Sequence, residues 1–378
     1  MLAADSERQA TDAALDTAFT AADWQRIRHD SEAWWAGRLD RPLVPLHLRP
    51  AGAAPGAGAC PPAFALDDLS PAQAVDRWTR ALAGQRHAAD GFPWVYCDYG
   101  PGVTAAFLGC RAQVDTRTVW FHPPEPRPAI AHLHLAYNED SPCFARVVAL
   151  MRAAMERWRG RVLLSTTDLG GTLDILAAFR PGVELPLDLY DHPAEVERLV
   201  DEIHRAWFAY YDRCEDVLQP SNPGHTAWSG IYASGSYYML QCDFAYMISP
   251  AMFDRFVRPE LAASCRRLDR SFYHLDGPGQ LPHLDSILSI AELDGVQWIP
   301  GTGQPPCEDW PEIYTRIRAA GKLAQFLGSI DEFERLVQRI GRCDGFVLGH
   351  QTVDEADFPA VARRLEALGV PPVHAGAR

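Results

Sequence analysis

A histidine and an aspartate, His274 and Asp276, stand two residues apart at the end of the apolar run 271–275, which has the pattern of a buried strand. Side chains two apart on a strand point to the same side, and a Gly-Pro-Gly sequence then turns the chain away. An imidazole and a carboxylate placed in this way could ligate a transition metal. His350, at the end of the last predicted strand, could supply a third ligand, which predicts a site for Zn²⁺ or non-haem Fe²⁺. The alternative without a metal is a histidine that the acid orients.

Three other aspartates stand where predicted strands end. Asp98 and Asp168 are followed by glycine-containing turns, and Asp243 precedes a predicted helix by a few residues. Each could be a general acid or base, or a polar contact to a substrate. An aspartate at such a turn could equally cap the next helix. For Asp98 the next helix is too far along the chain for a simple cap, which favours a function.

Aromatic and polar side chains near the same strand ends could bind a substrate. Tyr238 and Trp298 could wall an apolar pocket, although aromatic residues in this pattern are also typical of a core. Gln297 stands next to Trp298, and Arg49 follows the first predicted strand. We therefore predict substrate contacts from Arg49, Tyr238, Gln297 and Trp298.

Eight strand-like runs, most of them separated by helix-like segments, must position these residues. The runs are 43–48, 94–98, 162–166, 225–231, 271–275, 295–299, 323–327 and 345–349, and the strongest helix patterns are 192–218, 249–269, 309–321 and 331–340. Strands that alternate with helices are typical of a parallel sheet. Eight such units in a chain of 378 residues predict a (β/α)₈ TIM barrel, a fold that places function at the carboxyl ends of its strands. A doubly wound open sheet is the alternative, but no GxGxxG motif follows any predicted strand.

The chain is predicted to have one main domain. Residues 1–40 have the Ala-rich amphipathic spacing of a helical segment that ends near Trp34 and Trp35, and residues 41–378 would form the barrel. Residues 49–62 are rich in Gly, Pro and Ala, which predicts a loop.

Composition restricts the partners and the compartment. The formal net charge of −14 disfavours nucleic acids and anionic membrane surfaces, because the field of the protein repels polyanions. Nine cysteines without a CxxC pair argue against a disulfide framework. With no apolar run of about 18 residues and no signal-peptide pattern at the N-terminus, we expect a cytoplasmic protein that acts on a small molecule. The single lysine, Lys322, begins its predicted strand at the end opposite the site, which argues against Schiff-base catalysis.

Four runs resemble the uroporphyrinogen decarboxylase superfamily, which also contains methylcobamide-dependent methyltransferases. They are SPAMFDRFVRPELAASCRRLD (249–269), HLDGPG (274–279), GVQWIPG (295–301) and FVLGH (346–350). The resemblance extends from Trp34 and Trp35 to the last helix. It implies a (β/α)₈ barrel, as the strand pattern does, and a homodimer.

The two branches of this superfamily imply different chemistry. Decarboxylases carry an arginine-rich motif after the first strand, where this chain has Arg49, and an aspartate and a histidine of that branch match Asp98 and His350. The methyltransferase branch binds Zn²⁺ with a His-x-Cys pair after the fifth strand and a cysteine after the eighth. His274, Asp276 and His350 match those positions, so the resemblance implies a metal held by nitrogen and oxygen in place of sulfur.

We therefore expect metal-assisted transfer of a methyl or related group on a small molecule. The metal would be Zn²⁺ or another divalent transition metal, and the resemblance implies a corrinoid, free or on a corrinoid protein, as methyl donor. One alternative is a metal-free decarboxylase-like lyase, in which Asp98 would stabilise a protonated intermediate and His350 would orient a substrate carboxylate. Another is a non-catalytic protein that binds a corrinoid or a tetrapyrrole.

Overall fold

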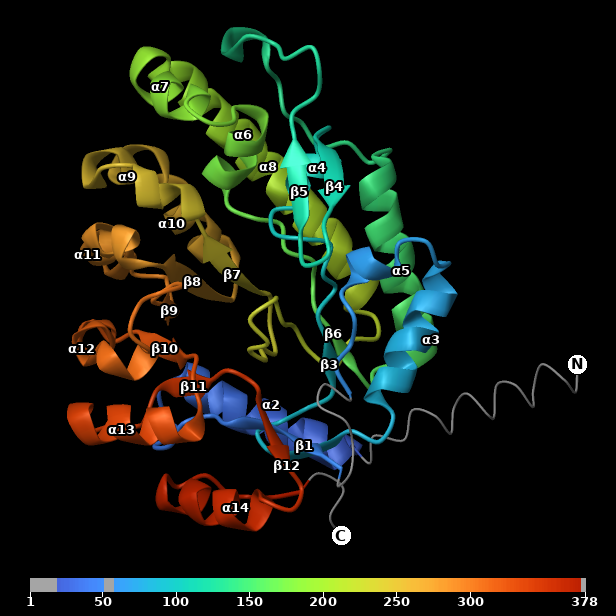
Figure 1. Cartoon of the computed structure of the whole chain (residues 1–378), viewed down its shortest axis with the longest axis vertical. Coiled ribbons are helices and arrows are strands. Elements are labelled where there is room, and N and C mark those ends of the chain that lie inside the picture. The colour runs from blue at the N-terminus through green and yellow to red at the C-terminus, as the bar shows by residue number, and fades with distance from the viewer. Residues whose placement is uncertain (1–18, 51–57, 375–378) are drawn as a thin grey trace, which may run out of the picture.

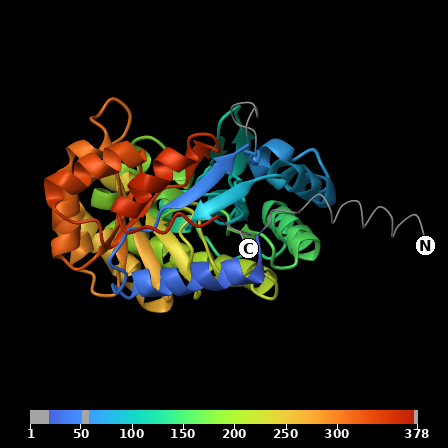
Figure 2. The ribbon, with the colours of Figure 1, turned by 90° about the horizontal axis from the view of Figure 1, so that it is seen from below.

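Strands form the centre of the molecule and helices cover it on the outside (Figures 1 and 2). The computed structural model describes residues 19–50 and 58–374. Within this part of the chain, no helix is long and apolar enough to cross a lipid bilayer. The mixed α/β architecture with a parallel sheet confirms the predicted class of fold.

The main sheet has five parallel strands that lie in chain order. They are β7 (Tyr237–Gln241), β8 (Arg270–Asp276), β9 (Gly295–Ile299), β10 (Leu323–Phe326) and β11 (Phe346–Leu348). In the register of this sheet, His274 lies between Gln241 of β7 and Gln297 of β9. The carboxyl ends of parallel strands share one edge of a sheet, so this register brings the residues that follow β7 and β8 close together.

Two smaller sheets and a hairpin complete the strands. Their members are β1 (Pro45–Arg49), β2 (Arg86–Ala89), β3 (Trp94–Val95), β6 (Leu163–Leu164) and β12 (Gln351–Asp354), with β4 (Arg111–Val114) and β5 (Val119–His122) in the hairpin. β1 pairs in parallel with β12 and antiparallel with β2, while β3 pairs in parallel with β6. A bridge between Leu43 and Val347 continues the main sheet toward β1.

Backbone hydrogen bonds do not close these strands into the predicted ring of eight. Among the described residues, no ladder joins β6 to β7 or β3 to β1. The predicted strand at 225–231 is wrong, because this segment is a loop with a single bridge between His225 and Ala233. Gly230, at φ +72°, turns the chain there, and the strand of this region is β7. The parallel α/β fold is therefore confirmed, while a closed TIM barrel stays a prediction.

The helices begin and end largely where local signals predict. They are α2 (Ala21–Trp35), α3 (Pro71–Leu82), α4 (Thr104–Phe107), α5 (Pro142–Trp158), α6 (Thr172–Phe179), α7 (Glu184–Asp191), α8 (Pro193–Leu218), α9 (Pro250–Phe256), α10 (Arg258–Arg267), α11 (Leu284–Leu288), α12 (Pro311–Ala319), α13 (Ile330–Ile340) and α14 (Phe358–Ala367). Pro193 and Pro311 stand in first turns, where the helix needs no N–H group. The helix predicted over 249–269 is split into α9 and α10, because Pro259 cannot donate the hydrogen bond that would continue it.

Helix α2 runs across the end of the main sheet at which β7 and β8 begin (Figure 2). The indole of Trp35 packs against the ring of Tyr237, the first residue of β7, with centroids 5.6 Å apart. The guanidinium of Arg270, the first residue of β8, lies 5.5 Å from the same indole. Helix α2 ends at Trp35, which confirms the predicted end of the helical segment. Residues 1–18 of that segment, and 51–57 of the predicted loop, lie outside the described residues.

Lys322 lies at the same end, directly before β10. Its Nζ donates hydrogen bonds to the carbonyls of Ile290, Ala291 and Leu293 at 2.7 to 3.0 Å. These three bonds give the amine a structural role, which agrees with the argument against Schiff-base catalysis.

Candidate functional site

Three side chains, Asp243, His274 and Asp276, converge at the carboxyl ends of β7 and β8, and we refer to them as the Asp-His-Asp cluster. Each offers one ligand atom, and these atoms lie within 4.8 Å of one another. His274 and Asp276 come from the end of β8, as predicted, and Asp243 begins the 3₁₀-helix η3 (Asp243–Met247) just after β7. The third member is therefore Asp243 and not His350, because β7 pairs directly with β8.

A row of amides holds His274 in place. Its Nδ1 lies 2.5 Å from Oε1 of Gln297, whose Nε2 donates to Oε1 of Gln325 at 2.6 Å. Gln325 in turn donates to the carbonyl of Ser229 at 3.1 Å. Because an amide oxygen only accepts, Nδ1 of His274 carries the proton and Nε2 keeps the lone pair that a metal needs. Gln297 is only 1% exposed, so the structure gives it a positioning role instead of the predicted substrate contact.

Negative charge accumulates around the Asp-His-Asp cluster. Partial desolvation at the strand ends, together with the charge of Asp276, raises the pKa of Asp243 to about 6. A divalent cation at the cluster would relieve this repulsion between carboxylates. Two carboxylates and one imidazole are also a donor set that suits Zn²⁺ or Fe²⁺, with coordination positions left open for a substrate. The residues present therefore fit a catalytic metal.

A third acid, Asp174 of α6, orients the cluster from behind. Its carboxylate accepts the backbone N–H groups of Asp243 at 3.0 Å and Phe244 at 2.7 Å. Burial, followed by the charge of Asp243, raises the pKa of Asp174 to about 7. In the sequence Asp174 is an acid in the first turn of a helix, where acids commonly face the helix dipole. No local signal could therefore single it out.

The loop that replaces the predicted strand at 225–231 lies between β6 and β7 (Figure 1). Before it, the side-chain amide of Asn222 bonds to both the N–H and the carbonyl of Leu164 in β6, at 3.0 and 2.8 Å. Asn222 thus takes the place of a backbone partner for β6. Farther along, Trp228 packs edge-on against His274, with ring centroids 5.0 Å apart. This loop therefore forms part of the wall around the cluster.

His350 lies in a row of three histidines that ends on the carbonyl of Gly230. Its Nε2 lies 2.9 Å from that oxygen, and its Nδ1 lies 2.8 Å from Nε2 of His47. Nδ1 of His47 lies 3.0 Å from Nδ1 of His87. Because a carbonyl only accepts, the rings must donate in sequence from His87 through His47 and His350 to Gly230. Both ring nitrogens of His350 are therefore occupied, and neither is free for the predicted metal.

Burial keeps the three-histidine row uncharged. It is the largest cause that lowers the pKa of His350 to about 4, that of His87 to about 3, and that of His47 well below its usual value. For His47 and His87, the repulsion that a proton on a neighbouring ring would cause lowers the pKa further. The sequence analysis did not single out His47 or His87, since a histidine within a strand has no motif of its own.

The three-histidine row predicts a pH dependence of stability. Folded-state pKa values below the ordinary value of about 6.5 mean that the unfolded chain binds more protons under mildly acidic conditions. The contribution of these histidines is therefore fully present above that pH and is lost as the pH falls toward 4. We expect His87→Phe to make the fall in the free energy of unfolding shallower, by up to about 1.4 kcal/mol per pH unit.

The measurement is urea unfolding of wild type and His87→Phe between pH 7 and 4. The free energies of unfolding of the two proteins are subtracted at each pH, so that the contribution of the buried acids, which both proteins share, cancels. Replacement of the exposed His132 by glutamine is the control and should leave the wild-type slope unchanged. Equal slopes in wild type and His87→Phe would contradict a neutral row.

Asp98 and Asp168 each accept a backbone N–H two residues farther on, from Gly100 at 2.9 Å and Gly170 at 2.8 Å. Such turns explain why aspartate suits these positions. The helices that follow begin with other N-cap residues, so neither aspartate is a cap. Burial raises the pKa of Asp98, and raises that of Asp168 to about 7. Burial thus brings the pKa of Asp168 closer to neutral than that of an ordinary carboxyl, and its acid–base role stays a prediction.

The predicted aromatic contacts belong to the core. Tyr238 and Trp298 are both fully buried. The hydroxyl of Tyr238 accepts the N–H of Leu169 at 2.6 Å, and Trp298 packs edge-on against Trp310. The structure thus favours the core interpretation of these rings over the pocket-wall interpretation.

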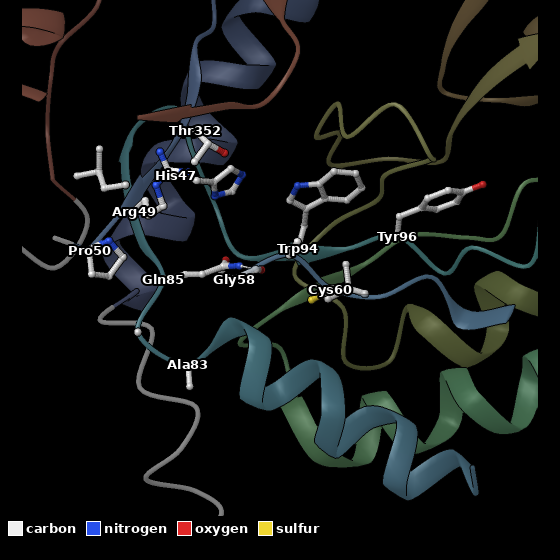
Figure 3. A pocket seen from close by; sticks show the side chains of 14 residues that line it. His47, Arg49, Pro50, Gly58, Cys60, Ala83, Gln85, Trp94, Tyr96 and Thr352 are labelled. Carbon is white, nitrogen blue, oxygen red and sulfur yellow. Dashed lines mark hydrogen bonds between the residues drawn. The ribbon is translucent and has the colours of Figure 1, made fainter. Parts of the chain in front are cut away.

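A cavity of about 600 Å³ adjoins the three-histidine row (Figure 3). Its wall includes His47, Arg49, Gln85, Trp94, Tyr96 and Thr352. Arg49 lies where predicted, but its Nε bonds to Oδ1 of Asp354 at 2.5 Å, so its charge is already compensated. A cavity of this size suits a small-molecule ligand.

Comparison with known proteins gives a likeness of fold. No family model matches the chain, and no curated protein matches it. Among solved structures, the chain is similar to a methyltransferase from Methanosarcina mazei, with a TM-score of 0.55 over 87% of this chain and 94% of that chain. The two sequences are 13% identical, so the likeness shows the fold alone. The chain thus shares the α/β fold of that methyltransferase.

Proposed function

We propose that the protein is a metal-dependent enzyme that transfers a methyl or related group on a small molecule, within a barrel of the uroporphyrinogen decarboxylase type. The convergence of Asp243, His274 and Asp276 at the carboxyl ends of two neighbouring strands carries this proposal. In barrels with parallel strands these ends are where catalytic residues lie. The likeness of fold to a methyltransferase supports the same type of chemistry.

Zn²⁺ or another divalent transition metal at the Asp-His-Asp cluster would act as a Lewis acid that activates a nucleophile. The carboxylates of Asp243 and Asp276 and Nε2 of His274 would hold it. Gln297 keeps the required tautomer of His274, and Asp174 fixes the backbone that carries Asp243. Partners of this kind commonly change metal affinity 10- to 100-fold when they are removed.

The remaining parts of the proposal concern the substrate and the partners. Asp168 would exchange a proton with a reactant, since its pKa of about 7 allows both states near neutral pH. The cavity would hold the small molecule. A corrinoid as methyl donor, free or on a partner protein, and a homodimeric assembly are supported by the sequence resemblance.

Metal analysis tests the proposal. We expect protein purified without added metal to contain about one divalent transition-metal ion per chain, because the described residues offer one such donor set. Removal of the metal with a chelator should abolish methyl transfer from methylcobalamin to a thiol, and added Zn²⁺ should restore it. Full activity in metal-free protein would contradict the proposal.

The lyase alternative has less support from the structure. His350 was expected to orient a substrate carboxylate, but both of its ring nitrogens bond to the protein. An octacarboxylate such as uroporphyrinogen also needs several fixed cations, whereas the described cavity wall has one arginine, which pairs with Asp354.

We therefore expect a spectroscopic titration with uroporphyrin to show no saturation at low micromolar concentration. The reason is the shortage of uncompensated cations around the cavity. Arg49→Gln should change this weak binding little, since Arg49 is already paired. Saturation at low micromolar concentration would show that other arginines supply the cations and would favour the lyase.

A further inference from the structure

One face of the extended segment 94–98 carries an indole, a phenol and a carboxylate. Trp94, Tyr96 and Asp98 are partly exposed, while Val95 and Cys97 between them are buried. This alternation follows from the period of two in an extended chain. Trp94 and Tyr96 line the cavity of about 600 Å³ (Figure 3). Two aromatic rings therefore form neighbouring parts of one wall.

The histidines beside these rings add no positive charge. Trp94 stacks against His350, with ring centroids 4.8 Å apart, and His350 bonds through both nitrogens. His47 in the cavity wall also bonds through both nitrogens. Arg49 in the wall is paired with Asp354. The described cavity wall thus offers aromatic faces and no uncompensated cation.

The carboxylates of Asp98 and Asp168, unlike the guanidinium of Arg49, have no oppositely charged partner among the described residues. Among the described residues, no arginine or lysine pairs with Asp98, and its carboxylate accepts only the N–H of Gly100. Asp168 likewise bonds to backbone N–H groups and to Tyr238. The whole chain carries a net charge of −14, which favours the approach of cations. By alternation, Asp98 therefore continues the face of Trp94 and Tyr96 with a carboxylate that no described arginine or lysine pairs with.

We propose that this cavity binds a small organic cation that carries N-methyl groups, with the methyl groups against Trp94 and Tyr96 and with Asp98 as counter-charge. The faces of indole and phenol rings attract such cations through the ring quadrupole, most strongly for tryptophan. A methylated ammonium group carries the kind of carbon that a methyltransferase moves. The inference therefore rests on the proposed function and names its substrate class.

Choline and its uncharged isostere 3,3-dimethylbutan-1-ol are the probes, because they differ in charge and hardly in shape. We expect choline to quench tryptophan fluorescence and to bind in calorimetry about 2- to 30-fold more tightly than the isostere. Trp94→Phe keeps a ring but weakens the quadrupole, so it should reduce this ratio. Asp98→Asn keeps the acceptor for Gly100 and should also reduce it. Trp120→Ala, which removes an exposed indole of β5, is the control and should leave it unchanged.

Equal binding of the two probes, tighter binding of the isostere, or no choline binding at all would overturn the inference. The titration is carried out on both chelated and metal-loaded protein. This design distinguishes a failure of the cation site from a failure of the proposed metal-dependent transfer. Choline binding in protein that never contains metal would leave the cation site intact and overturn metal-dependent transfer. Metal-dependent methyl transfer without choline binding would overturn the cation site alone.

Discussion

Asp243→Asn is expected to lower the affinity for a divalent transition metal at least about 100-fold and to lower methyl transfer with it. The substitution keeps an oxygen in place but removes one of the two charges that would balance the cation. Loss of a residue that only orients a metal ligand commonly lowers metal affinity about 10- to 100-fold. Loss of a ligand itself should therefore lower the affinity at least about 100-fold. The fold should remain, because Asp243 is the most exposed member of the Asp-His-Asp cluster and a catalytic site contributes less to folding than a closed structural one.

The measurement combines metal competition, turnover and the melting temperature. His274→Ala should give the same loss of metal and turnover with little change in melting temperature. Asp285→Asn is a matched control, because this exposed carboxylate of α11 pairs with Arg316 outside the cluster. Unchanged metal content and turnover in Asp243→Asn would remove Asp243 from the ligands. If wild type also lacked metal, the cluster would instead hydrogen-bond a substrate.

Arg41→Met is expected to lower the free energy of unfolding by about 3 to 5 kcal/mol, because it leaves a buried carboxylate without its cation. The guanidinium of Arg41 makes two bonds to Asp90, at 2.8 and 2.9 Å, and one to Asp30 at 3.0 Å. Asp90 also accepts the N–H of Val44 at 2.8 Å, just before β1. The pair therefore fixes the point at which the first strand begins.

Urea unfolding measures this loss, and the double variant Arg41→Met with Asp90→Asn is the informative comparison. Asparagine still accepts the N–H of Val44 but carries no charge, so the double variant should recover part of the lost stability. Arg205→Ala, which breaks an exposed pair with Asp201 on α8, should change stability little. A loss below about 1 kcal/mol for Arg41→Met would show that the site relaxes or admits water.

The sequence by itself determined the elements whose signals are local. The apolar run 271–275 predicted β8, and the period of two in a strand placed His274 and Asp276 on one face. Ser329 caps α13 through a capping box, and the apolar spacing of that helix is unambiguous. In each case the residues that create the signal are neighbours in the chain, so no distant contact is needed to interpret them. The parallel α/β class followed from the alternation of such elements.

The tertiary structure alone decided which of these residues meet. The sequence led us to predict His350 as the third partner of His274, whereas the pairing of β7 with β8 brings Asp243 there instead. The row from His350 to His87 is likewise formed by β1, β2 and the junction before β12. The strand-like run 225–231 became a loop, since Gly230 turns there and its carbonyl is taken by His350. Strand order and burial are set by contacts between segments far apart in the chain, and a local pattern carries no record of them.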